Sequence, residues 1–271
     1  KGITMPIVVL NADAGSFDKM VAYSLEPEIY SFHSLADFVR SVERYGAHNY
    51  PIHIKLDTGM HRLGFVEQEV DELIALLKDS RSVRVATIFA HLSCADDPTQ
   101  DDFTRRQIAL FDAMSGRIAA AMPYDVLRHT ANSAAIERFP EAAFDMCRLG
   151  LGLYGYGYCH NEELQPVATL KTRIVQLRHR AKGEAIGYGR SQVLERDSVI
   201  ATIPIGYADG IPRSLRGAML TLHTEKGDFP VKIIGSICMD QCMIDLSGID
   251  AKVGDCVSFF GHTPTSLTAL A

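Results

Sequence analysis

The chain has 271 residues, enough for one large domain or two ordinary ones, and 47% of them are hydrophobic and 22% charged. Its formal net charge of -6 at pH 7 argues against a nucleic-acid partner, which would require a basic surface. There is no run of about 18 apolar residues and no signal-peptide pattern near Lys1, so we expect no membrane span and a cytoplasmic location.

Short apolar runs alternate with helical patterns in the first part of the chain. Strands are predicted at residues 7–10, 28–31, 52–56, 83–89, 126–127 and 144–149. Helices are predicted between several of them, with apolar stripes around residues 35–45, 66–77 and 103–111. We expect Ser34 to cap the first of these helices, with Asp37 at its third position and Gly46 at its end.

This repetition of strand and helix, with strands that are apolar throughout, predicts a parallel sheet covered by helices. Polar side chains follow the predicted strands, and parallel barrels place their active sites at that rim. These side chains are Asn11, Lys55, Asp57, His91, His129, Asn132 and Arg148. From the pattern alone, a closed barrel and an open doubly wound sheet are equally consistent with the sequence.

From about Pro166 the pattern changes to short β-rich runs separated by glycine and charged turns. Strands are predicted at residues 169–177, 199–204, 219–223, 231–234 and 242–246. No long helical stripe interrupts them, so we predict an all-β domain. The expected domains are therefore residues 1–160 and 166–271, with a linker over residues 156–163.

The six cysteines show no C-x-x-C spacing, and a chain of this length needs no disulfide framework. Two small clusters, Cys159-His160 and Cys238 with Cys242, do not match a zinc spacing. We expect reduced and mostly buried thiols, and no metal site.

Three charges gather around the end of one predicted strand, in the segment Asp57-Thr58-Gly59-Met60-His61-Arg62-Leu63-Gly64 and just before it. Lys55 and Arg62 are two cations close in sequence, and two close cations destabilise each other unless an anion lies between them. The alternative is a surface ion-pair cluster that includes Asp57.

Further candidates lie on either side of the predicted domain boundary. Ser133 begins a short predicted helix, which it could cap, or it could bind a phosphate there. Arg148 stands inside an apolar run and needs a partner or a ligand, and Gly150 would let a backbone N–H approach an anion. Tyr207 lies in a glycine-flanked turn, which suits either packing or catalysis. Residues 235–241 by themselves indicate only a β-hairpin.

Taken together, several segments resemble the alanine racemase family in their order and spacing. They are HIKLDTGMHRLGF, FAHLS, HTANSAA, FDMCRLGLGLYG, GYGRS, IGYADGIPR and GSICMDQ, and the resemblance extends from about residue 3 to residue 246. It implies a (β/α)8 TIM-like barrel followed by a C-terminal β domain. It also implies the cofactor pyridoxal 5'-phosphate and a head-to-tail homodimer in which each active site combines two subunits.

The resemblance assigns the cofactor-binding residues. Arg148 matches the arginine that hydrogen-bonds the pyridine nitrogen, and because arginine does not give up its proton, that nitrogen would stay neutral. Ser133, with the backbone of Gly150 and Leu151, matches the phosphate cradle. Asn132 matches the residue beside that cradle.

The resemblance also assigns the catalytic groups. Tyr207 matches a phenolic acid/base supplied by the partner subunit, and His91 matches the imidazole that links Tyr207 to Arg148. Lys55 matches a lysine that is often carbamylated, and the carbamate would be the anion that holds Arg62 toward the cofactor and the substrate carboxylate. Two bases on opposite faces exchange the Cα proton, namely Tyr207 and the lysine that forms the Schiff base.

On the substrate side, Met239 matches a position whose backbone N–H meets the substrate carboxylate. Cys238 and Asp240 lie beside it in the sequence, and Met60 lies in the same turn as Arg62. We expect these residues to contact L- or D-alanine.

One part of the family pattern is not found in the 271 residues. The Schiff-base lysine of the family stands on the first barrel strand in a Lys-Ala-x-Ala-Tyr-Gly-type segment, whereas Lys1 aligns with a later stretch. The closing segment of the family is not found either. We therefore expect a barrel that lacks its first strands, a chain truncated at both ends, and no racemase activity from this chain alone.

Other functions stay open at this point. The chain could be an inactive module of a larger fusion protein, for example behind a peptidoglycan ligase, or a related serine racemase or barrel-type decarboxylase. The IGYADG and CMD segments favour a racemase over a decarboxylase, and an alanine racemase would supply D-alanine for peptidoglycan. A choice between alanine and serine is not readable, because an added hydroxyl is hard for a small pocket to reject.

Overall fold

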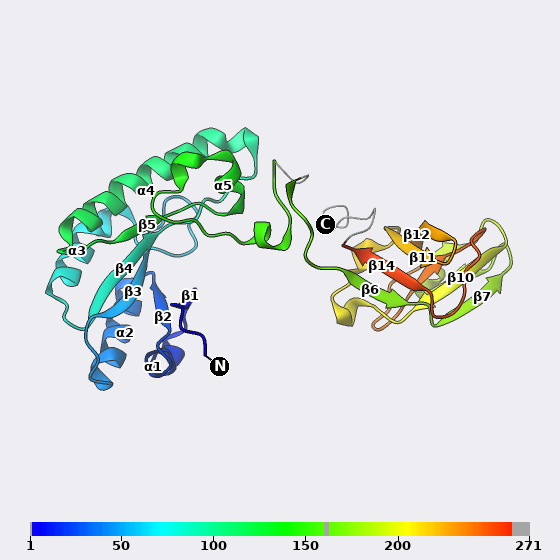
Figure 1. Ribbon diagram of the computed structural model, residues 1–271, viewed down its shortest axis with the longest axis horizontal. Coiled ribbons are helices and arrows are strands. Elements are labelled where there is room, and N and C mark those ends of the chain that lie inside the picture. The colour runs from blue at the N-terminus through cyan, green and yellow to red at the C-terminus, as the bar shows by residue number, and fades with distance from the viewer. Residues whose placement is uncertain (1, 160–162, 262–271) are drawn as a thin grey trace. The chain divides into compact units, whose positions relative to one another are not determined.

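The computed structural model describes residues 2–159 and 163–261. The chain divides into two compact units, Lys1–Leu164 and Gln165–Ala271, and each is described by itself (Figure 1). In the described residues, no helix is both long enough and apolar enough to cross a membrane.

The first unit is built on a five-stranded sheet in which every neighbouring pair is parallel. The strands are β1 (Val8–Val9), β2 (Glu26–Ile29), β3 (Tyr50–Lys55), β4 (Val83–Phe89) and β5 (Leu127–His129). They follow one another across the sheet in chain order. A doubly wound sheet would place its first strand in the interior of the sheet, so this order selects the barrel over the open sheet.

Five helices follow the strands: α1 (Phe17–Ala22), α2 (Phe32–Arg44), α3 (Val70–Asp79), α4 (Asp101–Ala121) and α5 (Ser133–Arg138). Figure 1 shows α2, α3 and α4 along the outer side of the curved sheet. The main core lies between these helices and the outer face of the strands, with Ile52 and Ile54 of β3 fully buried against it. Because side chains alternate along a strand, His53 and Lys55 lie on the opposite, inner face.

A register shift in the pairing of β3 with β4 determines which residues share that inner face. The shift falls between Ile52 and His53, after which His53 pairs with Thr87 and Lys55 pairs with Phe89. On the next strand, Phe89 pairs with His129. The inner face is therefore lined by polar and aromatic side chains, unlike the aliphatic outer face.

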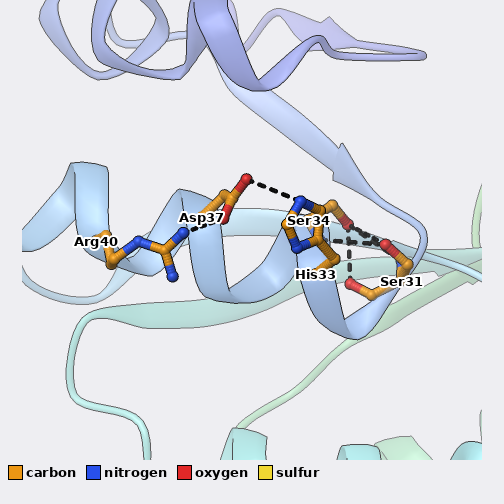
Figure 2. Close-up of polar contacts among 5 residues, drawn as sticks. All are labelled: Ser31, His33, Ser34, Asp37 and Arg40. Atoms are coloured by element: carbon orange, nitrogen blue, oxygen red, sulfur yellow. Dashed lines mark hydrogen bonds and ion pairs between the residues drawn. The ribbon is translucent and has the colours of Figure 1, made fainter.

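Helix α2 starts earlier than predicted, and its cap is Ser31 and not Ser34. The Ser31 hydroxyl accepts from the backbone N–H of Ser34 at 3.1 Å, and the Ser34 hydroxyl accepts from the backbone N–H of Ser31 at 3.1 Å (Figure 2). Asp37 instead pairs with Arg40 in the helix itself. The prediction missed Phe32, which begins the helix and packs edge-on against Phe65 at 5.1 Å between ring centroids.

The strand predicted over residues 144–149 is wrong. Phe144 has a φ of 51°, which no strand contains, and a turn closes there through the bond from Met146 N–H to the Ala143 carbonyl at 3.2 Å. An irregular segment follows it and is fixed by the bond from Arg148 N–H to the Ala131 carbonyl at 3.0 Å. Arg148 therefore reaches the site from a loop.

The second unit is all β, as predicted, with a seven-stranded antiparallel sheet in the order β6-β14-β11-β12-β13-β10-β7. Its strands are β6 (Leu170–Arg173), β7 (Gln176–Arg180), β10 (Ser198–Ile203), β11 (Met219–Thr224), β12 (Gly227–Ile234), β13 (Cys242–Asp245) and β14 (Cys256–Phe260). A small hairpin pairs β8 (Ala185–Ile186) with β9 (Gln192–Val193). The single strand predicted over residues 169–177 is instead two strands at opposite edges of the sheet, and β14 was not predicted.

The six cysteines are all free. Cys242 is buried, but Cys147 and Cys159 are exposed, so the expectation of mostly buried thiols is wrong. The described residues hold no group of three or more His, Cys, Asp or Glu side chains placed to bind a metal ion.

Candidate active site

A cavity of about 740 Å³ lies in the first unit, where segments that follow the parallel strands meet. Its lining includes all of the predicted catalytic and cofactor-binding residues of this unit, namely Lys55, Arg62, His91, Asn132, Ser133, Arg148, Gly150 and Leu151. Three of them are cations, and Glu28 is the one carboxylate among the described residues of the lining. The cavity therefore suits an anionic ligand.

Arg148 is the centre of the polar network in this cavity. Its Nη2 donates to the carbonyl oxygens of Ala90 and Thr130 at 2.8 and 3.2 Å. Nη2 also lies 3.4 Å from Nδ1 of His91, while Nη1 lies 2.7 Å from Nδ1 of His129. Among the described residues, the Nε–H of Arg148 has no hydrogen-bond partner, which leaves it available to a ligand.

Burial and positive charge keep both histidines of this network neutral. Burial lowers the pKa of His91 to about 4, and Arg148 acts in the same direction. Burial and Arg148 likewise lower the pKa of His129 to about 3. Burial lowers the pKa of Arg148 itself to about 10, so the guanidinium stays charged near neutral pH. The site therefore contains a fixed cation between two neutral imidazoles.

Lys55 is almost completely buried, with 5% of its surface exposed. Its Nζ lies 4.7 Å from the centroid of the Phe89 ring, and the guanidinium carbon of Arg148 lies 5.3 Å from the same centroid. Burial lowers the pKa of Lys55 to about 8, partly opposed by the negative charge of Glu28. Near pH 8 a large fraction of this amine is therefore neutral and nucleophilic.

Asp57 organises the turn and forms no ion pair with Lys55 or Arg62, so the alternative of a surface ion-pair cluster is wrong. Its Oδ1 accepts from the backbone N–H groups of Gly59 and His61, each at 3.0 Å. Burial raises the pKa of Asp57, but these bonds, together with the His61 side chain whose Nδ1 lies 3.2 Å from Oδ2, outweigh it and hold the pKa below its usual value. Gly64 closes the turn with a φ of 130°, where a Cβ would lie 2.5 Å from the backbone nitrogen of Asp57.

Ser133 does not cap α5, because Asn132 does so by accepting from the Ala135 N–H at 3.0 Å. The Asn132 amide also donates to the Leu92 carbonyl at 3.1 Å, which ties α5 to the segment after β4. The Ser133 hydroxyl instead accepts from the N–H groups of Gly150 and Gly152 at 3.0 and 3.3 Å. Two backbone donors thus converge on one oxygen at the edge of the cavity, and they belong to Gly150 and Gly152, where the family resemblance had implied Gly150 and Leu151.

The predicted residues Tyr207, Cys238, Met239 and Asp240 lie in the second unit, where the structure brings two of the recognised segments together. The Tyr207 N–H donates to the Cys238 carbonyl at 3.0 Å, and the Ala208 N–H donates to the Met239 carbonyl at 2.9 Å. Gly206 is required there, since a Cβ would collide with the backbone of residues 238 and 239. Tyr207 and Met239 are 44% and 54% exposed, so both side chains are accessible, and Asp240 is exposed beside them.

Some outcomes at single residues were not predicted. Met60 is half-buried and does not line the cavity. Two further residues belong to the site, namely Glu28 and Phe89, which lie on the inner faces of β2 and β4. His129, one of the polar side chains predicted at the rim, lies on the inner face of β5 and contacts Arg148. A polar residue within a buried strand was the signal that could have identified Glu28.

Two family models match the chain. The model described as "Alanine racemase, N-terminal domain" matches residues 1–157, and "Alanine racemase, C-terminal domain" matches residues 167–271. The chain belongs to the alanine racemase family. The family resemblance and the fold of a TIM-like barrel with a C-terminal β domain are thereby confirmed.

Relatives within the alanine racemase family match nearly all of this chain. Alanine racemase 1 of Clostridium acetobutylicum is 37% identical over 272 residues, which cover 97% of this chain and 69% of the relative. The solved alanine racemase of Clostridium difficile 630 has a TM-score of 0.88 at 30% identity and covers 100% of this chain and 71% of its own. That of Bartonella henselae, with covalently bound pyridoxal phosphate, has a TM-score of 0.84 at 27% identity, covering 100% of this chain and 74% of its own.

Proposed function

We propose that this chain supplies the cofactor site and one catalytic base of a pyridoxal-phosphate-dependent enzyme that interconverts L-alanine and D-alanine. The observation on which the proposal rests is the Arg148 network beside the Ser133 cradle, in a cavity whose described lining residues include three cations and one carboxylate. D-alanine made in this way would serve peptidoglycan synthesis in the cytoplasm.

The residues present fit pyridoxal phosphate. The backbone N–H groups of Gly150 and Gly152 already converge on an oxygen, that of Ser133, and a phosphate oxygen offers the same acceptor with more charge. The free Nε–H of Arg148 suits a ring nitrogen that accepts a hydrogen bond. A cavity of about 740 Å³ is within the usual range for a cofactor and a small substrate.

Each residue then has a definite task. When bound, the cofactor would supply a conjugated ring that withdraws electrons from the substrate Cα. Arg148 holds its proton, since its pKa is about 10, and therefore donates a hydrogen bond to the ring nitrogen without protonating it. That arrangement weakens electron withdrawal by the ring and favours return of the proton to Cα over transamination.

Proton transfer at Cα is assigned to Tyr207 on one face of the substrate. Its side chain is exposed, and its backbone N–H donates to the Cys238 carbonyl, which supports the grouping of Tyr207 with the substrate-contacting positions at residues 238–240. We assign Tyr207 to the partner subunit's site in a homodimer, with His91 as its neighbour there. The substrate carboxylate is assigned to Arg62, an exposed cation at the cavity edge.

Lys55 is assigned the carbamate role. A neutral, buried amine is the form that adds carbon dioxide, and a pKa of about 8 makes that form available near neutral pH. Addition of carbon dioxide to the neutral amine would release one proton and convert Lys55 from a cation into an anion, in a lining that also contains Arg62 and Arg148.

We further propose that these 271 residues alone do not racemise alanine. Lys55 is the one lysine among the described residues of the cavity lining, and the carbamate role excludes it from holding the cofactor covalently. The second base would then have to come from a lysine on a strand that this sequence does not contain.

The test is a titration of the purified chain with pyridoxal phosphate, together with a racemisation assay. We expect saturable binding that weakens at least tenfold in Arg148→Met, because a hydrogen bond from a charged donor contributes about 1.5–3 kcal/mol. Arg84 is exposed, so Arg84→Met serves as the matched control and should bind pyridoxal phosphate as the wild type does. Equal binding by the wild type and Arg148→Met would contradict the assignment of Arg148, and alanine turnover at an enzyme-like rate would contradict the inactivity of the chain.

A further inference from the structure

An unbroken series of hydrogen bonds crosses the inner face of the sheet from Arg148 to Glu26. Arg148 Nη1 lies 2.7 Å from His129 Nδ1, and His129 Nε2 lies 3.0 Å from the Thr87 hydroxyl. The same hydroxyl lies 2.8 Å from His53 Nδ1, and His53 Nε2 lies 2.7 Å from Glu26 Oε2. Each of the strands β2, β3, β4 and β5 contributes one member.

The register of the sheet produces this alignment. Because the register shifts after Ile52, Thr87 stands opposite His53 and its side chain shares the inner face with that of His129. Thr87, His53 and His129 are all buried, at 6%, 4% and 4% exposure. Water cannot replace a lost partner there at low cost, so each polar atom depends on its neighbour in the series.

Arg148 determines the direction of the first two bonds. A guanidinium has N–H donors and no acceptor, so Nδ1 of His129 has to accept from it. Burial and the charge of Arg148 keep the pKa of His129 at about 3, and a neutral imidazole carries a single ring proton. That proton is consequently on Nε2, which donates to the Thr87 hydroxyl.

The direction continues to the far end of the series. Thr87 accepts from His129, so its own single proton is donated to Nδ1 of His53, and the ring proton of His53 is on Nε2 and points at the Glu26 carboxylate. Burial lowers the pKa of His53 against the opposing effect of Glu26, which supports the neutral ring. A doubly protonated His53 would leave the Thr87 hydroxyl proton with no acceptor in the series.

We propose that Glu26, His53, Thr87 and His129 form a directional hydrogen-bond relay that positions Arg148, with its Nη1 engaged and its Nε–H presented to the cavity. These four are positioning residues, since they act on the ligand through Arg148. The inference deepens the proposed function, on which the role of Arg148 rests. Three side chains separate Glu26, the carboxylate at the far end of the relay, from the guanidinium of Arg148 that it helps to orient.

The first test measures the ring-proton positions without any ligand. Nitrogen NMR of the full chain labelled with ¹⁵N-histidine distinguishes a protonated from a bare ring nitrogen, and single His→Gln variants assign the signals. We expect Nε2 protonated and Nδ1 bare at both His53 and His129 at pH 7. A proton on Nδ1 of either ring would overturn the relay.

The second test asks whether a change at Arg148 reaches His53. In Arg148→Met, Nδ1 of His129 loses its hydrogen-bond donor. We therefore expect the ¹⁵N chemical shift of His53 Nδ1 to move toward the value of a protonated nitrogen. Thr87→Val, which retains the branched shape but removes the hydroxyl, should block that transmission in the double variant, and Thr87→Ser should restore it. No shift at His53, or the same shift in the Thr87→Val background, would overturn the relay.

The third test measures the effect on ligand binding, with Thr104→Val as the matched control. Thr104 is a fully buried threonine whose hydroxyl has no hydrogen-bond partner among the described residues. We expect Thr87→Val to weaken pyridoxal phosphate binding at least threefold, and Thr87→Ser and Thr104→Val to bind as the wild type does. Unchanged binding in Thr87→Val would overturn the positioning role. If the wild type itself binds no pyridoxal phosphate, the proposed function fails, while the two NMR tests still decide whether the relay exists.

Discussion

Burial governs the behaviour of Lys55 more than any neighbouring charge does. Burial removes most of the water around the ammonium group, and the attraction to Glu28 compensates only part of the lost hydration. Arg148 and Arg62 add repulsion from two sides. A protonated Lys55 therefore destabilises the folded chain.

This leads to a pH-dependent stability. The pKa of Lys55 is about 8 in the folded chain and 10.5 in its usual state, so between these values the unfolded chain binds more protons and stability rises with pH. Below pH 8 Lys55 is protonated in both states, so the free-energy cost of burying its charge does not change with pH.

We expect Lys55→Met to be more stable than the wild type at pH 7, by at most roughly 3 kcal/mol, and the difference to shrink toward pH 10.5. Urea unfolding at several pH values, in buffer free of carbon dioxide so that Lys55 stays an amine, measures it, and Lys171→Met at an exposed position is the control. A difference that does not change with pH would contradict the burial argument.

At the scale of elements, local hydrogen bonds fix the helix ends and loops next to the functional residues. The reciprocal pair of Ser31 and Ser34 starts α2 directly after β2, the strand that carries Glu26 and Glu28 (Figure 2). The loop that carries Arg148 is likewise fixed by bonds to the segment after β5. Caps and loop bonds of this kind set the position of the inner face relative to the cavity.

Removal of the α2 cap has a predictable cost. We expect Ser31→Ala to lower the free energy of unfolding by about 1 kcal/mol, the usual contribution of a serine cap. Ser16→Ala is the matched control, because Ser16 occupies the capping position of α1 without a side-chain capping bond. Chemical denaturation of the two variants compares them directly, and an equal loss of stability in both would contradict the role of the capping bond.

Sequence patterns predicted elements better than their arrangement. The apolar runs predicted β4 over residues 83–89 and the all-β second unit, because these patterns are local. They could not choose between a barrel and a doubly wound sheet, since strand order depends on pairing between distant segments. The alignment of His53 with Thr87 was also unpredictable, because it depends on a register shift inside an apolar strand. Arg148 was identified as needing a partner, yet the strand assigned to it is a loop.

At the scale of the whole molecule, the chain holds two independent sets of hydrophobic clusters. The clusters of the first unit are formed by residues up to Phe144, and those of the second begin at Leu170, with no residue shared among the described ones. The assigned catalytic groups are divided in the same way, with Arg148 and Lys55 in one unit and Tyr207 in the other. Each unit therefore has a hydrophobic core of its own, whereas the proposed reaction requires residues of both.

The independence of the second unit can be measured. We expect residues 165–271, expressed as a separate polypeptide, to give a dispersed amide NMR spectrum and a cooperative thermal transition, because the seven-stranded sheet buries its own core. The same residues within the full chain provide the reference spectrum. A collapsed spectrum for the separate polypeptide would show that its core needs the first unit.

The proposed cofactor site is tested most directly by a crystal structure of the chain grown with pyridoxal phosphate. We predict the phosphate beside Ser133 and the N–H groups of Gly150 and Gly152, and the ring nitrogen within hydrogen-bond distance of Arg148 Nε. Cofactor bound elsewhere, or a ring nitrogen directed away from Arg148 in a well-occupied site, would contradict the account.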